Sequence, residues 1–178
     1  LANLCPHFHL SLQSSSDATL TRMNRKYTAE RFLESCRLLR QYFDRPAITT
    51  DLICGFVGET EKEFAETLAM IEKADFSAMH IFPYSRRGGT VADRMPNAVK
   101  DARCHQAAAV AAQMEQRYLE SWVGETLPVL FEEEADGLWR GHAPNYVAVY
   151  AAGADLHNVL KDVKIAGLHG QALEGVIL

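Results

Sequence analysis

The stretch 47–60, AITTDLICGFVGET, decides the fold of this chain. Its first half is rich in β-branched residues, which favours a buried strand, and Gly55 and Gly58 then supply a turn. Thr60 stands three residues before Glu63, which is the spacing of a capping box at the start of a helix. In a parallel α/β fold such a junction lies at the carboxyl end of the sheet, where ligands bind. The stretch therefore predicts the active end of the protein.

Strand and helix patterns flank this stretch on both sides. Residues 7–13, HFHLSLQ, alternate between polar and apolar side chains, which predicts a strand. Apolar residues then recur at helical spacing from Thr28 to Phe43, and a second helix is expected after Thr60. A short strand follows at 79–82. The order strand, helix, strand, helix, strand predicts three parallel strands joined by right-handed crossovers.

One face of the predicted sheet is polar, whereas parallel strands covered on both faces are usually apolar throughout. The polar positions come from all three strands: His9, Ser11, Gln13, Thr49, Asp51 and His80. A partly closed barrel explains them, because inward residues would line a lumen that holds polar ligands. Three such units make about half a barrel, so we expect the other half before Leu1 and the chain to be a fragment.

After residue 82 the predicted secondary structure changes twice, from a loop and a long helix to a series of short strands. Residues 83–97, PYSRRGGTVADRMPN, form a loop at the position of an active-site rim, and a long helix is predicted over 98–121. Gly124 ends that helix. Five short strands separated by turn residues follow, which predicts a small OB-like barrel: 126–131, 138–141, 146–150, 159–165 and 172–178. The predicted fold class is α/β plus all-β, with domains at 1–121 and 122–178.

Charge and cysteine usage narrow the class of protein. Residues 1–121 carry 15 basic and 15 acidic side chains, whereas residues 122–178 carry 3 and 8, a net charge of −5. No apolar run approaches the roughly 20 residues that span a bilayer, and no signal peptide opens the chain, so we expect a cytoplasmic protein. The cysteines have no zinc, cluster or disulfide spacing, so no metal site is predicted: Cys5, Cys36, Cys54 and Cys104.

Four ordered segments resemble one family: HFHLSLQSSSD (7–17), RMNRKYT (22–28), TTDLICGFVGET (49–60) and IFPYSRRGGTVADRMPN (81–97). With the five-strand tail, they resemble the radical S-adenosylmethionine (SAM) methylthiotransferases, which modify a tRNA adenosine beside the anticodon or an aspartate of a ribosomal protein. The resemblance implies half of a radical-SAM partial TIM barrel and a TRAM-type barrel that docks RNA. It also implies two 4Fe-4S clusters in the full-length parent. Their cysteine motifs are not in this sequence, so the chain alone is expected to be inactive.

The resemblance further implies a SAM pocket at the carboxyl ends of the three strands. By this match the ribose and methionine portions meet Ser11, Gln13 and Ser14, and the adenine meets Asp51, Ile53, Gly55, Phe82, Pro83 and Tyr84. Ser15 stands where the family usually has glycine, so a left-handed turn there would be strained. Alternatively, these positions are barrel-lining polar residues and packing aromatics that bind no ligand.

Basic residues gather in two loops and suit contact with RNA phosphates: Arg22, Arg25 and Lys26, then Arg86, Arg87 and Arg94. Ordinary surface solvation is the alternative. The acidic barrel opposes docking of RNA through repulsion, although a local face can still bind it. The residues of that face are Lys161, Lys164, Arg140, Trp139, Tyr146 and Tyr150.

The implied activity is conversion of an N6-modified tRNA adenosine to its 2-methylthio form. Residues 22–28 resemble the threonylcarbamoyladenosine branch more than the isopentenyladenosine branch, and the ribosomal-protein aspartate branch is a further alternative. Two other classes stay open: a non-catalytic RNA-binding protein, and an ordinary TIM-barrel enzyme with Asp51 and His80 as an acid and base pair. If the barrel is cut before residues 8–13, that unpaired strand edge predicts self-association.

Overall fold

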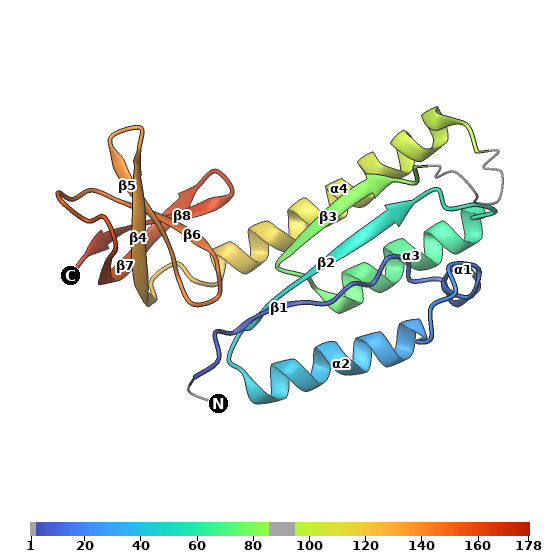
Figure 1. Ribbon diagram of the computed structural model, residues 1–178, viewed down its shortest axis with the longest axis horizontal. Coiled ribbons are helices and arrows are strands. Elements are labelled where there is room, and N and C mark those ends of the chain that lie inside the picture. Colours follow the sequence, from blue (N-terminus) through green and yellow to red (C-terminus); the bar gives the residue numbers. More distant parts are fainter. Residues whose placement is uncertain (1–2, 86–94) are drawn as a thin grey trace. The chain divides into compact units, whose positions relative to one another are not determined.

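The computed structural model describes residues 3–85 and 95–178 (Figure 1). Two compact units make up the chain: Phe8–Met114, and Leu1–His7 with Glu115–Leu178. The predicted boundary at 121/122 differs from this division, which falls inside helix α4 (Asn97–Glu120). The physical reason is that Leu119 and Trp122 are buried in the core of the second unit.

The unit Phe8–Met114 is built on a parallel sheet. Among the described residues its strands β1 (His7–His9), β2 (Ala47–Cys54) and β3 (Ala78–Pro83) lie in the order β1–β2–β3, as predicted (Figure 1). Helices α1 (Asp17–Arg22) and α2 (Ala29–Tyr42) join the first two strands, and α3 (Glu61–Ala74) joins the last two. The sequence patterns predicted α2 and α3 but not α1.

Local capping explains where the two longer helices of this sheet begin. The Thr28 side chain accepts from Arg31 N–H at the start of α2. Thr60 and Glu63 form the predicted capping box at the start of α3, with each side chain bonded to the other's backbone. The junction between β2 and α3 is therefore set by the stretch 47–60 itself.

One face of the sheet is buried under helices. Ile48 and Leu52 of β2 have no exposed surface and pack in one core with Phe32 of α2, Ile71 of α3 and Met114 of α4. Since successive strand residues point to opposite faces, Thr49, Asp51 and Ile53 lie on the other face and are only half-buried. The predicted polar face is thus the one opposite the face that these helices cover.

The first strand is shorter than predicted. Regular pairing ends at His9, although Leu10 N–H still donates to Thr49 C=O at 2.9 Å, and a strand bridge to β2 returns between Gln13 and Leu52. Between them the Thr50 hydroxyl takes the place of the backbone ladder: it accepts from Leu12 N–H at 3.0 Å and donates to Leu10 C=O at 2.5 Å. A side chain of the neighbouring strand therefore interrupts the strand that alternation alone predicted over 7–13.

The second unit contains the predicted five-stranded barrel. Its strands are β4 (Thr126–Ala135), β5 (Leu138–His142), β6 (Ala148–Ala151), β7 (Val159–His169) and β8 (Ala172–Ile177). They close in the order β4–β5–β6–β8–β7, with β6 and β8 parallel and the other pairs antiparallel. β6 begins two residues later than predicted because Tyr146, with φ of 64°, belongs to a turn. Within the described residues, no helix is long and apolar enough to cross a bilayer.

Candidate cofactor site at the carboxyl end of the sheet

The open face of the sheet carries a hydrogen-bonded polar row. The two ring nitrogens of His9 lie 3.0 Å from Thr49 Oγ1 and 3.2 Å from Asp51 Oδ2. The His80 ring is 6.3 Å from the His9 ring between centroids. The imidazole within hydrogen-bond distance of Asp51 is therefore that of His9, whereas the TIM-barrel alternative pairs Asp51 with His80.

The predicted cofactor residues of the three strands are neighbours at the carboxyl end. Gln13 N–H donates to Asp51 C=O, and Ile53 N–H donates to Gln13 C=O, both at 2.9 Å. On the other side, Ile53 pairs with Phe82 in the β2–β3 register, and Tyr84 N–H donates to Cys54 C=O at 2.8 Å. The structure thus brings Gln13, Ile53 and Phe82 side by side across the sheet.

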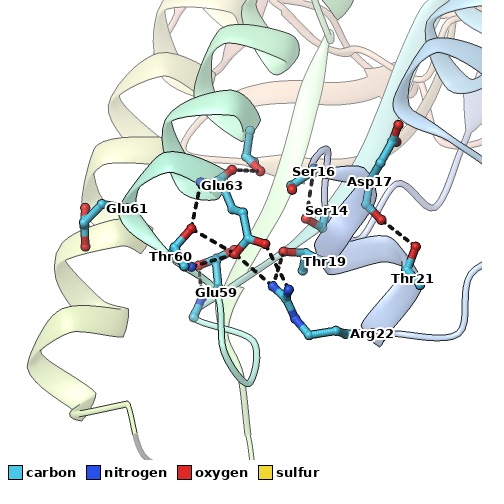
Figure 2. Close-up of polar contacts among 12 residues, drawn as sticks. Ser14, Ser16, Asp17, Thr19, Thr21, Arg22, Glu59, Thr60, Glu61 and Glu63 are labelled. Atoms are coloured by element: carbon cyan, nitrogen blue, oxygen red, sulfur yellow. Dashed lines mark hydrogen bonds and ion pairs between the residues drawn. The ribbon is translucent and has the colours of Figure 1, made fainter.

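A run of buried serines follows Gln13. Ser14, Ser15 and Ser16 are at most 5% exposed, and Ser16 N–H donates to Ser14 Oγ at 3.4 Å (Figure 2). The hydroxyls of Ser15 and Ser16 are buried without a hydrogen-bond partner among the described residues. The left-handed residue is Gln13, with φ of 67°, so the strain expected at Ser15 falls two residues earlier. Ser14, predicted to face the lumen, has no exposed surface, whereas Ser11 is exposed.

The glycine turn after β2 has little room for a side chain. Gly55 has φ of +75°, and a Cβ there would lie 2.5 Å from Lys100 Cγ and 3.0 Å from Met95 Sδ. Lys100 is itself buried and its Nζ donates to Tyr84 C=O at 3.2 Å. Glycine at position 55 therefore permits the close approach of α4 to the ends of β2 and β3.

Arg22, the last residue of α1, links this helix to the start of α3. Its two terminal nitrogens donate to the two carboxylate oxygens of Glu63, each at 2.9 Å, and one also donates to Thr19 Oγ1 (Figure 2). The Arg22 hydrogen bond, with help from the backbone and side chain of Thr60, lowers the pKa of Glu63 to about 2. Arg22 ends a helix and does not lie in a loop as predicted, and its guanidinium is engaged within the protein.

A second arginine, which sequence reasoning missed, holds the glycine turn from α4. Arg103 Nη1 donates to Glu59 Oε2 at 2.7 Å and to Glu59 C=O at 3.0 Å, and Nη2 donates to Glu61 Oε1 at 2.6 Å. The side chains of Arg103 and Glu59 are both almost fully buried, and this burial raises the pKa of Glu59. The available signal was helical spacing, because Lys100 and Arg103 continue the buried stripe of Ala107 and Met114.

Comparison with known proteins adds a family to this geometry. Residues 1–71, which include the serine run and the glycine turn, match the family model described as "Radical SAM superfamily". Threonylcarbamoyladenosine tRNA methylthiotransferase of Bacillus subtilis is 38% identical over 89% of this chain and 38% of that protein. tRNA-2-methylthio-N(6)-dimethylallyladenosine synthase of Thermoanaerobacter sp. is 36% identical over 100% of this chain and 40% of that protein. An enzyme with the latter name from Acidothermus cellulolyticus is 44% identical over 74% of this chain and 27% of that protein.

Over most of its length the chain is similar to the radical SAM methylthiotransferases. It spans about two fifths of the length of the first two of these relatives. The matched residues 1–71 include Gln13 and Ile53 at the carboxyl end of the sheet, whereas Phe82 and Tyr84 lie outside this range.

A cavity of this chain lies at the end of β3. It has a volume of about 480 Å³, and its lining includes Tyr84, Asn97, Lys100 and Asp101. The Tyr84 ring also packs edge-on against Phe56 at 4.9 Å between centroids. The cavity thus adjoins the segment whose backbone the family resemblance assigns to adenine.

The described basic residues predicted to contact RNA do not form one cluster. Arg25 and Lys26 are exposed beside α1, and Arg86, Arg87 and Arg94 lie outside the described residues. In the barrel, Lys161 and Lys164 are three residues apart on β7 and so point to opposite faces. Lys164 donates to Gly124 C=O, and Arg140 donates to Glu133 at 2.8 Å. The structure therefore does not bring the predicted barrel cations together on one face.

Ligands for an iron–sulfur cluster are not grouped in the described part of this chain. Its four cysteines are free thiols, of which Cys36 and Cys54 are buried and Cys5 is exposed. No three His, Cys, Asp or Glu side chains of residues 3–85 and 95–178 form a metal-binding group. The four cysteines described here therefore do not fit the ligation of such a cluster.

Proposed function

We propose that this protein acts in SAM-dependent tRNA methylthiolation, and that its substrate is N6-threonylcarbamoyladenosine beside the anticodon. One observation carries the proposal: two relatives, one named for tRNA 2-methylthio chemistry and one for methylthio transfer, are similar to this chain over 89% and 100% of its length. Both relatives are longer than this chain, so the proposal concerns the complete gene product that contains it.

The residues at the strand ends fit SAM on the evidence of unused polar groups. The buried Ser15 and Ser16 hydroxyls have no partner in the described structure, and buried hydroxyls usually have one. A polar ligand such as the ribose or the amino-acid portion of SAM would supply it. Gln13 and Ile53 would hold the cofactor from the neighbouring strands, and Tyr84 would cover the adenine. When bound, SAM supplies the methyl group and the radical that activates the substrate carbon.

The tRNA substrate is the finer part of the proposal. Relatives named for threonylcarbamoyladenosine and for dimethylallyladenosine resemble the chain to similar degrees, at 36–44% identity. The segment RMNRKYT (22–28) resembles the threonylcarbamoyladenosine branch and so favours that substrate. Its exposed residues Arg25 and Lys26 would contact tRNA phosphates.

The test is methylthiolation by the complete gene product under anaerobic conditions. Three substrates are offered with SAM: tRNA carrying threonylcarbamoyladenosine, tRNA carrying dimethylallyladenosine, and the ribosomal protein whose aspartate is modified. Mass spectrometry of the digested products should show a methylthio group on threonylcarbamoyladenosine only. Product on either other substrate would overturn the branch assignment. Binding of tRNA without any methylthio product, unaffected by SAM, would favour the non-catalytic RNA-binding alternative.

A matched pair of variants ties the activity to the site. Gln13→Ala removes a side chain at the strand end, and Gln41→Ala removes an exposed glutamine from α2. We expect Gln13→Ala to lose roughly tenfold or more in activity and Gln41→Ala to match the wild type. Equal activities would place the cofactor elsewhere.

A further inference from the structure

The side chain of Glu59 closes the glycine turn from inside. Its Oε2 accepts from Gly55 N–H at 2.8 Å, so the carboxylate bridges the first and last residues of the turn 55–59. The side chain is only 1% exposed. A buried carboxylate requires a charged or multiply hydrogen-bonded partner, because burial in an apolar site penalises its charge.

Arg103 is that partner, and its geometry fixes more than charge. Its guanidinium spans the side chain and the carbonyl of Glu59 with one nitrogen and the carboxylate of Glu61 with the other. The guanidinium carbon also lies 5.2 Å from the centre of the Phe64 ring. Three residues around the β2–α3 junction are thereby tied to one side chain of α4.

Stability alone is a weak explanation for such a pair. Replacing a buried ion pair with apolar side chains of similar volume is often neutral or stabilising, because desolvation offsets the attraction between the charges. The planar guanidinium, with its donors in fixed directions, does fix the position of its acceptors, whereas an apolar contact would not. The turn so fixed carries Gly55 directly after Ile53 and Cys54, and Cys54 C=O accepts from Tyr84 N–H.

We propose that Arg103 is a positioning residue, which acts through Glu59 to hold the backbone at Gly55 in the shape that binds the adenosine portion of SAM. This inference rests on the proposed function, since it assumes that the turn meets SAM. Arg103 is itself buried, and its guanidinium is hydrogen-bonded to Glu59 of the turn, so the inference assigns it no contact with SAM.

The experiment uses the complete gene product and the probe S-adenosylhomocysteine, which binds without turnover. Affinity is measured by calorimetry for the wild type, Arg103→Met, Arg103→Lys and the double variant Glu59→Gln/Arg103→Met, each at a temperature where circular dichroism shows it fully folded. Hydrogen exchange of the peptide that contains Gly55 reports on the turn without any ligand. Arg37→Met is the matched control, because Arg37 pairs with Glu30 on the exposed face of α2.

We expect Arg103→Met to weaken binding roughly tenfold and to speed exchange at the turn, with Arg103→Lys intermediate because lysine reaches one acceptor only. The double variant removes both charges, so its thermal midpoint should recover while its binding stays weak. A purely structural role predicts that binding recovers with the midpoint, and that result would overturn the inference. If Arg103→Met fails to fold, Arg103→Lys decides in the same way: binding and exchange equal to the wild type reject the positioning role. A wild-type protein that does not bind the probe would instead refute the proposed function.

Discussion

Glu63 performs two tasks at one helix start. One of its oxygens accepts Thr60 N–H at 2.7 Å in the capping box, while both accept from Arg22. The cap is a local feature that can be predicted from the sequence, but the ion pair joins residues 41 positions apart. The same carboxylate therefore caps the start of α3 and ties this helix to the end of α1.

The Glu63→Gln variant separates these tasks, because glutamine also completes a capping box but carries no charge. The pKa of Glu63 is about 2 in the folded protein, below the usual value near 4.3. The pair therefore stabilises the fold above that usual value, and the stabilisation is lost as pH falls toward 2. We expect Glu63→Gln to lower the free energy of unfolding by about 1–2 kcal/mol at neutral pH and by little once the pH is at or below about 2.

Urea denaturation at several pH values checks this dependence. Glu66→Gln, an exposed position of α3, is the control and should change stability little at any pH. A loss for Glu63→Gln that is the same in acid as at neutral pH would mean that the cap, not the ion pair, is responsible.

The thiol of Cys54 should be the slowest of the four to react. It is 1% exposed, and burial, followed by the nearby thiol of Cys104, raises its pKa well above the ordinary range. Because the thiolate is the reactive form, native alkylation should label exposed Cys5 first and Cys54 last. Mass spectrometry of iodoacetamide-treated protein gives the order. Labelling of Cys54 at the rate of Cys5 without denaturant would contradict its burial at the end of β2.

At the scale of elements, β1 and β2 are held together by one side chain as much as by their ladder. The Thr50 hydroxyl accepts from Leu12 N–H and donates to Leu10 C=O, and both residues lie in the gap between His9 and Gln13. After this gap the chain re-enters the sheet at Gln13 with a left-handed backbone and turns into the serine run. Thr50 thus shapes the segment that carries three of the predicted cofactor residues.

Thr50→Val keeps the shape of this side chain and removes its hydrogen bonds. Leu12 N–H would be left buried without an acceptor, so we expect the free energy of unfolding to fall by about 2–3 kcal/mol. Thr49→Val, on the open face of the same strand, is the control and should cost less than about 1 kcal/mol. Thermal melts and hydrogen exchange at residues 10–13 test both. Unchanged exchange in Thr50→Val would show that backbone pairing alone holds β1.

At the scale of the whole molecule, the chain has two separate cores. The barrel buries Val129, Val149, Val163 and Leu173 completely, and its last strand is hydrogen-bonded on both sides. Closure leaves the barrel without a free strand edge, which removes the usual route to aggregation. Residues 122–178 also carry a net charge of −5, and Lys161 and Lys164 on β7 point to opposite faces. RNA binding by this unit cannot therefore rest on one basic face that contains both of them.

Residues 115–178 should fold without the rest of the chain, because their core is closed. We expect dispersed amide resonances for this 64-residue polypeptide, although a core of this size gives only marginal stability. Leu173→Ala should abolish that dispersion, and Leu160→Ala, on an exposed side chain, should preserve it. A spectrum of unfolded chain for the parent polypeptide would mean that the barrel needs the other unit.

Much of the candidate site could be predicted from local signals. The glycine turn, the capping box and the polar positions of β2 follow from turn chemistry and from alternation, which involve residues close in sequence. Arg103 and the true role of Arg22 could not, because their partners lie more than 40 residues away. The left-handed backbone expected at Ser15 lies instead at Gln13, with φ of 67°.

The sequence by itself determined the order of strands and helices, the closed five-stranded tail and the family resemblance, since periodicity, turn residues and motif spacing are properties of the chain. Only the tertiary structure decided where β1 stops, which arginines hold the glycine turn, and which barrel cations share a face. These features depend on which side chains of distant elements meet, and burial makes each such meeting costly to leave unsatisfied.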